Sequence, residues 1–163
     1  MTRVLVTGGA GFIGSHLVDR LVDQGYDVRV IDNLYSGKLE NIERHIKSGK
    51  VDFVEGDIRD ADLIKKSLVG IDAVFHLAAI ISVPFSVSNP ELTFDVNLTG
   101  TLNLLNASSE NNVKKFIFVS SCAVFGDTKI LPVNENASTN PISPYAESKL
   151  LACLLYTSDA ADE

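Results

Sequence analysis

Tyr145 and Lys149 form the pattern in this sequence that points most directly to chemistry. Residues four apart share one face of a helix, so a helix here brings the phenol and the ammonium group together. A phenol is a poor base at neutral pH, and a nearby positive charge favours its phenolate. The spacing therefore predicts that Tyr145 carries protons in catalysis and that Lys149 keeps it active.

Ser121 is the third candidate catalytic residue. It follows an expected strand over residues 115–119, so its hydroxyl lies at the carboxyl end of that strand. There it can bind a substrate hydroxyl and relay a proton to Tyr145, and a role as a strand-end cap is the alternative. We interpret Cys122 as a small buried residue rather than a nucleophile, because no base is evident beside it.

A glycine-rich loop lies between the first expected strand and the first expected helix. Glycine permits a tight turn and lets the backbone approach a pyrophosphate closely, and the helix N-terminus adds free N–H groups and partial positive charge. This strand–loop–helix context predicts a dinucleotide site rather than a purely structural turn. The residues expected to contribute are Gly8, Gly11, Phe12, Ile13 and Gly14.

Asp32 is the acidic residue that such a site requires at the end of the second strand. Its carboxylate can accept hydrogen bonds from ribose hydroxyls and would repel a 2′-phosphate. Residues 33–37 contain no Arg or Lys, so the sequence favours NAD over NADP. Further expected cofactor contacts are Asn33, Ser36, Gly37, Asp57, Ile58, Leu77, Ala78, Ala79, Asn97, Tyr145 and Lys149.

Three of these groups have specific expected roles. Asp57 and Ile58, after the third strand, would pair with the adenine amino group and pack on its ring; the alternative for Asp57 is a helix N-cap. The small residues of 77–79 let backbone lie against the cofactor. Asn97, a poor helix former inside an expected helix, would bond the loops near the nicotinamide, or else be a polar surface residue.

Strand and helix signals alternate along the chain. This alternation predicts an α/β fold with right-handed crossovers and a doubly wound parallel sheet, the Rossmann fold, in strand order 3-2-1-4-5. The expected strands are 3–7, 27–31, 51–55, 72–76 and 115–119, and the expected helices are 12–22, 38–46, 60–69 and about 90–111.

Composition excludes several other classes of protein. The chain has 163 residues and a net charge of −7, without the clustered basic residues of a nucleic-acid surface. It has no apolar run of about 18 residues for a membrane span, and no signal peptide, so the cytoplasm is the expected location. The histidines and the two cysteines have no metal-ligand spacing, so no metal is expected.

The last eleven residues, Cys153–Glu163, differ in character from the rest. They match one reading frame of a transposase adapter used in sequencing libraries, which indicates a non-native tail. The alternative is a native helix that continues past Lys149. On the first interpretation, residues 1–152 are an NAD-binding domain truncated before its last strands and its substrate lobe.

Together these motifs resemble the extended short-chain dehydrogenase/reductase family, the NAD-dependent epimerases and dehydratases. The resemblance covers residues 1–152, and the segments 32–37 and 97–101 look like those of UDP-sugar 4-epimerases. The family's motif positions fall on Thr7, Gly8, Gly11, Gly14, Asp32, Asp57, Ile58, Ser121, Tyr145 and Lys149.

The resemblance implies NAD-dependent epimerisation of a nucleotide sugar at C4 through a transient 4-keto sugar. It also implies a UDP-sugar substrate and a homodimer for the full-length enzyme. Because the truncation removes the lobe that would grip the substrate, we expect the fragment itself to be inactive. A dehydratase, dehydrogenase or reductase on the same scaffold is the alternative, although Cys122-Ala123 replaces the acid that dehydratases carry beside the catalytic hydroxyl. A non-catalytic NAD-binding module is the alternative from another class.

Overall fold

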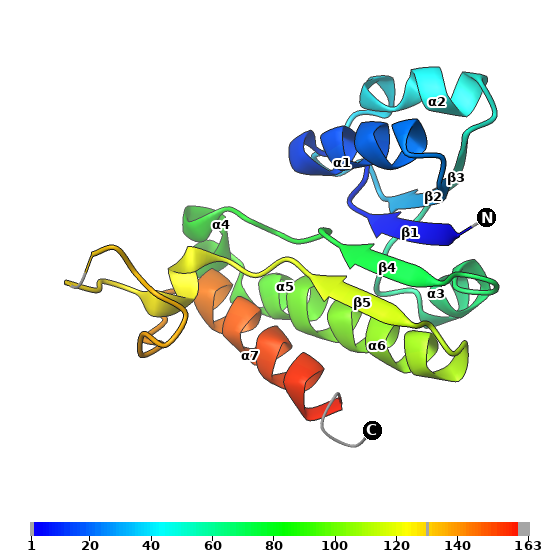
Figure 1. Ribbon diagram of the computed structural model, residues 1–163. Helices are drawn as coiled ribbons and strands as arrows, with labels where there is room; N and C mark the ends of the chain where they lie inside the picture. Colours follow the sequence, from blue (N-terminus) through cyan, green and yellow to red (C-terminus); the bar gives the residue numbers. More distant parts are fainter. Residues whose placement is uncertain (1, 130, 160–163) are drawn as a thin grey trace. The chain divides into compact units, whose positions relative to one another are not determined.

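The computed structural model describes residues 2–129 and 131–159 and contains a parallel sheet in the order β3-β2-β1-β4-β5 (Figure 1). This order confirms the doubly wound Rossmann fold predicted from the sequence. The strand positions agree with the prediction to within one residue at either end. The strands are β1 Arg3–Thr7, β2 Asp27–Asp32, β3 Val51–Glu55, β4 Ala73–His76 and β5 Lys115–Phe118.

The helices depart from the prediction in three places. The expected helix 38–46 is a short 3-10 turn followed by α2, the expected helix 90–111 contains a π-helical turn, and α4 was not predicted at all. The helices are α1 Phe12–Asp23, α2 Glu43–Lys47, α3 Ala61–Ser67, α4 Val83–Ser88, α5 Pro90–Phe94, α6 Gly100–Glu110 and α7 Pro144–Asp159. The other turns are η1 Leu39–Asn41, η2 Asp95–Thr99 and η3 Cys122–Phe125.

α4 escapes sequence analysis because it has only six residues and no amphipathic repeat. Local caps specify it instead: the Ser82 hydroxyl accepts a hydrogen bond from the Phe85 N–H at 3.3 Å, and Pro84 stands in its first turn. The π turn η2 separates α5 from α6, and π turns of this kind often mark functional sites.

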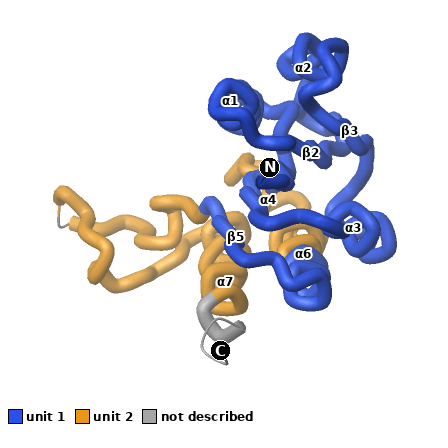
Figure 2. Tube along the Cα trace, turned by 45° about the vertical axis from the view of Figure 1, so that its right-hand side comes forward, with its two compact units in different colours: residues 1–79, 103–119 blue, residues 80–102, 120–163 orange. Residues whose placement is uncertain are grey.

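The chain divides into two compact units (Figure 2). The first comprises residues 1–79 and 103–119 and contains the whole sheet with α1, α2 and α3. The second comprises residues 80–102 and 120–163 and contains α4, α5, η2, η3 and α7. The glycine loop and Asp32 therefore belong to the first unit, and the candidate catalytic residues belong to the second.

The core of the first unit is built from the strands and one side of α1. Val4, Val6, Val28 and Val30 are at most 1% exposed, and α1 adds Val18, Leu21 and Val22 from its later turns. Near-continuous apolar strands are what a sheet buried on both faces requires. Phe12 and Ile13 in the first turn of α1 are apolar as well, but they are 81% and 65% exposed.

α7 continues through Asp159, so residues 153–159 extend the helix that carries Tyr145. A non-native origin for 153–163 stays a prediction, and residues 160–163 lie outside the described residues. Within the part of the chain that the structure describes, none of the helices has the length and apolar character needed to cross a membrane.

The packing at Gly14 gives a first prediction. A Cβ at Gly14 would lie 2.1 Å from the Gly8 carbonyl oxygen, whereas a Cβ at Gly11 would lie 3.2 Å from the same atom. Gly14→Ala should therefore lower the free energy of unfolding by about 2–4 kcal/mol. Gly11→Ala should lower the free energy of unfolding by no more than about 1 kcal/mol. Urea unfolding of both variants measures this, and equal losses would contradict the packing argument.

Candidate functional site

The glycine loop is pressed against the end of β4. Gly8 has a φ of +71°, which favours glycine, and a Cβ there would lie 2.8 Å from the Ala78 amide nitrogen. The Ala78 N–H donates to the Thr7 hydroxyl at 3.3 Å. The structure thus brings the loop together with Leu77 and Ala78, two residues predicted to lie against the same ligand.

The N-terminus of α1 has the properties of an anion site. Gly11 is its N-cap, and no side chain among the described residues caps the helix there. The first N–H groups of a helix have no acceptor within the helix, and the dipole adds partial positive charge. Phe12 and Ile13, the residues that follow this cap, are exposed, and N–H groups at a helix start can bind a pyrophosphate.

Asp32 connects the glycine loop to the segment after β2. Its Oδ2 accepts the Ala10 N–H at 3.0 Å, and its Oδ1 accepts the Leu34 N–H at 2.8 Å. A Cβ on Gly37 would lie 3.0 Å from Oδ1, so this segment packs closely on the carboxylate, and Ser36 beside it is exposed. A carboxylate has about four acceptor positions, so Asp32 can still accept bonds from ribose hydroxyls.

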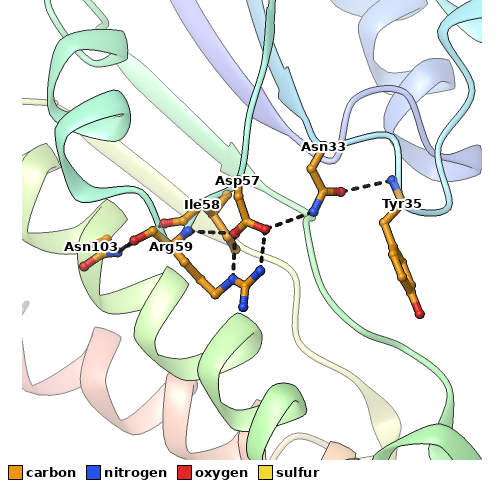
Figure 3. A network of polar contacts seen from close by, with 6 residues as sticks. All are labelled: Asn33, Tyr35, Asp57, Ile58, Arg59 and Asn103. Carbon is orange, nitrogen blue, oxygen red and sulfur yellow. Dashed lines mark hydrogen bonds and ion pairs between the residues drawn. The ribbon is translucent and has the colours of Figure 1, made fainter.

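Asp57 lies at the centre of a polar network (Figure 3). Arg59 donates from Nε to Oδ1 at 2.9 Å and from Nη2 to Oδ2 at 2.8 Å, and its backbone N–H also donates to Oδ1 at 2.9 Å. Asn33 Nδ2 donates to Oδ2 at 3.1 Å. The Arg59 side chain lowers the pKa of Asp57 to about 2, with help from the Arg59 backbone and Asn33.

Four donors therefore already occupy the Asp57 carboxylate, and an adenine amino group would have to replace one of them. Asn33 is the most exchangeable, since the Arg59 pair is bidentate and charge-assisted. The alternative role for Asp57 as a helix N-cap is wrong, because Asp60 caps α3 by accepting the Leu63 N–H at 3.0 Å.

Asn103 is a member of this network that sequence analysis missed. Its Nδ2 donates to the carbonyl oxygens of Ile58 at 3.2 Å and Arg59 at 3.0 Å, so α6 fixes the turn that presents Asp57 (Figure 3). An asparagine in a helix interior was the available signal, the same one that singled out Asn97. Its partner could not be found from the sequence, because it lies 45 positions away.

In the second unit, α7 carries Tyr145 and Lys149 one turn apart. Tyr145 is 9% exposed and Lys149 is 4% exposed. Burial lowers the pKa of Lys149 to about 8, and the neighbouring Cys153 opposes this effect. A buried lysine with a lowered pKa beside a tyrosine is the type of arrangement that concentrates at functional sites.

Both peptide groups of Tyr145 are held by buried serines. Its N–H donates to Ser86 Oγ of α4 at 3.1 Å, and its carbonyl accepts from Ser148 Oγ at 2.8 Å. Ser148 Oγ also accepts from Asn97 Nδ2 at 3.0 Å. The Asn97 side chain in turn pairs with both the N–H and the carbonyl of Ile80, at 2.8 and 3.0 Å.

Asn97 is therefore not the polar surface residue of the alternative reading, because it is 2% exposed. Its amide group bonds the segment that follows β4 and, through Ser148, the helix α7 that carries Tyr145 and Lys149. Sequence analysis missed Ser86 and Ser148, since isolated serines carry no pattern that distinguishes a buried hydrogen-bonding role from a surface one.

Ser121 is half-buried and caps η3, where its Oγ accepts the Ala123 N–H at 3.2 Å. The capping role that the sequence left as an alternative is thus present, and it uses the hydroxyl only as an acceptor, so the proton can still be donated. Cys122 is exposed, so the expectation that it is buried is wrong. Cys122 is the first residue of η3 and faces solvent.

The histidines have structural partners. His45 Nε2 lies 2.6 Å from Asp19 Oδ1 and joins α2 to α1, and His76 Nδ1 lies 2.7 Å from the Thr7 hydroxyl between β4 and β1. His16 Nδ1 lies 2.8 Å from the carbonyl of Phe12 in its own helix. No group of three or more potential metal ligands occurs among the residues that the structure describes.

Comparison with known sequences places these features in a family. The family model for GDP-mannose 4,6 dehydratase matches residues 5–158. A putative UDP-glucose 4-epimerase of Methanocaldococcus jannaschii is 47% identical over 148 residues, which cover 90% of this chain and 47% of that protein. The UDP-glucose 4-epimerase of Lactobacillus helveticus is 46% identical over 151 residues, covering 91% of this chain and 44% of that protein.

Solved structures agree with the sequence comparison. UDP-glucose 4-epimerase from Thermotoga maritima, solved with UDP-glucose, superposes with a TM-score of 0.92 at 42% identity, covering 98% of this chain and 52% of that one. The Bifidobacterium longum enzyme, solved with NAD+ and UDP, gives 0.90 at 41% identity, covering 99% and 50%. This chain spans about half the length of these proteins. The resemblance is thereby confirmed, and the chain belongs to the GDP-mannose 4,6 dehydratase family of NAD-dependent nucleotide-sugar epimerases and dehydratases.

Proposed function

We propose that this chain is the NAD-binding and proton-transferring half of a UDP-sugar 4-epimerase. The observation that carries the proposal is the pair on α7, where Lys149 is nearly fully buried with a pKa of about 8 one turn after Tyr145. The UDP-glucose 4-epimerases that match this chain support the choice of reaction.

The residues of the first unit fit NAD. The approach between Gly8 and Ala78 leaves no room for a Cβ, and the α1 N-terminus has no side-chain cap in the described chain, so backbone N–H groups can receive a pyrophosphate. Asp32 is held by two backbone N–H groups, with acceptor positions left for ribose hydroxyls. Its negative charge disfavours the 2′-phosphate of NADP.

Each catalytic side chain has a defined task in the proposal. Tyr145, as phenolate, takes the proton from the sugar 4-hydroxyl, and Ser121 donates a hydrogen bond to that hydroxyl. Bound NAD supplies the acceptor and later the donor of the hydride at C4, so the sugar passes through a 4-keto form. Tyr145 then returns the proton to complete the inverted sugar.

Lys149 holds positive charge near the phenol. With a pKa of about 8 it is mostly protonated at pH 7. Its burial restricts solvent screening of the ammonium group, so each unit of charge acts more strongly on a neighbouring phenolate than it would in water. Lysine burial therefore has a stability cost and an electrostatic benefit at the same position.

A 4,6-dehydratase is the second candidate, because the matching family model is described by that activity. Elimination of a hydroxyl needs an acid next to the catalytic serine. The η3 turn after Ser121 consists of Cys122, Ala123, Val124 and Phe125, and it offers no carboxyl group. This observation favours epimerisation. The proposal keeps the further expectations of a homodimer and a cytoplasmic location.

Replacement of the proposed proton carrier tests the mechanism. Tyr145→Phe in the full-length protein should reduce UDP-glucose/UDP-galactose interconversion by a factor on the order of 10²–10⁴, with NAD affinity retained. Tyr26→Phe is the matched control, since Tyr26 packs against the core of the first unit. Turnover within twofold of wild type would refute the mechanism, and a 4-keto-6-deoxy product from wild type would favour the dehydratase.

Cofactor choice depends on the charge at Asp32. Asp32→Arg should weaken NAD binding at least tenfold and shift the preference toward NADP, because the arginine can pair with a 2′-phosphate. Asp32→Asn removes the charge at constant size. It should reduce the preference for NAD over NADP without reversing that preference. Titrations with both dinucleotides measure the ratio of dissociation constants, and an unchanged ratio in Asp32→Arg would show that Asp32 does not face the ribose.

The buried lysine makes stability depend on pH. Lysine in an unfolded chain titrates near pH 10.4, so between about pH 8 and pH 10 the unfolded state binds more protons and wild-type stability rises with pH. Below pH 8 Lys149 is protonated in both states, so the full free-energy cost of burying its charge is present. Lys149→Met should therefore be more stable than wild type by about 2–3 kcal/mol at pH 7. Urea unfolding at pH 7 and pH 9.5 should show this advantage shrinking, and an advantage independent of pH would contradict the lowered pKa.

A further inference from the structure

We infer that Ser86 of α4 is a positioning residue for the phenol of Tyr145. The inference rests on the proposed function, in which Tyr145 transfers the proton, and it assigns a role to a residue outside the Ser/Tyr/Lys set. Ser86 is fully buried, and its hydroxyl binds the backbone N–H of Tyr145 at 3.1 Å.

The start of α7 shows why this contact matters. The first four N–H groups of a helix lack partners within it. Pro144 has no N–H. Ser143 caps the two N–H groups after Tyr145: its Oγ accepts the Ala146 N–H at 3.2 Å, and its carbonyl accepts the Glu147 N–H at 2.9 Å. The N–H of Tyr145 is instead received by another helix, so α4 sets where α7 begins.

The hydroxyl of Ser86 has a fixed orientation. Its proton is donated to the Val83 carbonyl at 2.7 Å, so a lone pair remains directed at Tyr145. The Ser86 N–H is bonded to the Ser82 carbonyl at 2.9 Å, which holds the residue in the short helix. α4 and α7 pack against each other in the second unit (Figure 1).

The carbonyl of Tyr145 is restrained as well. Ser148 Oγ donates to it at 2.8 Å and accepts from Asn97 at 3.0 Å. Tyr145 is therefore held on its N-terminal side by α4 and on its C-terminal side by a bond anchored in η2. Restraint at both peptide groups limits the displacement of the side chain, and a displacement of about 1 Å can lower a rate about 10²-fold.

Ser86→Ala removes the acceptor and leaves the Tyr145 N–H without its partner. In the full-length protein we expect kcat for UDP-glucose/UDP-galactose interconversion to fall at least about tenfold. KM and the dissociation constant of NAD should stay within about twofold, because Ser86 touches the helix start rather than a ligand. Ser88→Ala is the matched control, since the Ser88 hydroxyl donates within its own helix, to the Pro84 carbonyl.

A second measurement does not depend on activity. Amide hydrogen exchange at Tyr145, followed by NMR, should be at least about tenfold faster in Ser86→Ala than in wild type, and unchanged in Ser88→Ala. Ser86→Cys has nearly the same volume and a weak acceptor, so it should give a smaller loss of both kcat and protection. It replaces Ser86→Ala if that variant does not fold.

The outcomes distinguish a failure of the proposed function from a failure of the positioning role of Ser86. Wild-type protein without epimerase activity would refute the proposed function, while the exchange rates would still report whether Ser86 holds Tyr145. Wild-type kcat in a Ser86 variant whose Tyr145 amide has lost protection would overturn the positioning role, because the contact would then be structural alone. Unchanged protection in both Ser86 variants would overturn the contact itself. Equal losses of kcat in Ser88→Ala would assign the effect to α4 stability instead.

Discussion

The close approach of backbone to backbone around the glycine loop is the constraint on which the cofactor half of this structure depends. A Cβ at Gly8 would meet the Ala78 amide at 2.8 Å, and a Cβ at Gly14 would meet the Gly8 carbonyl at 2.1 Å. These contacts place the end of β1, the start of α1 and the end of β4 within van der Waals distance of one another. A side chain at Gly8 or at Gly14 would separate them and remove the cradle that a pyrophosphate needs.

The carboxylates of Asp32 and Asp57 use their oxygens differently. Asp32 accepts two backbone N–H groups and keeps capacity for further donors. Asp57 is saturated by Arg59 and Asn33, and its low pKa follows from the Arg59 contact. In the sequence the two acids occupy similar places at the ends of adjacent strands. In the structure Asp32 fixes the backbone, whereas Asp57 belongs to a side-chain network, and a further donor such as an adenine amino group would have to replace one of its present donors.

In the second unit, which contains Tyr145 and Lys149, buried polar groups join the helices. Ser86, Asn97 and Ser148 are each at most 2% exposed, and each makes hydrogen bonds that are specific in direction. Buried polar groups are costly unless they are paired, so a satisfied network strongly disfavours alternative positions of the helix. The same helix carries Lys149, whose burial lowers its pKa to about 8. The network thereby holds in place a helix that carries an unfavourable buried ammonium group.

The sequence by itself determined the sheet order, the glycine loop with Asp32, and the pairing of Tyr145 with Lys149. These features follow from local periodicity and from spacings of a few residues, which a linear chain displays directly. Only the tertiary structure decided that Phe12 and Ile13 are exposed, that Cys122 faces solvent, and that Asp57 is already saturated. It alone brought Ser86 to Tyr145, 59 positions away, and Asn103 to Ile58. Such contacts depend on how elements pack after they form, and a single serine or asparagine carries no local signal of the partner that packing will give it.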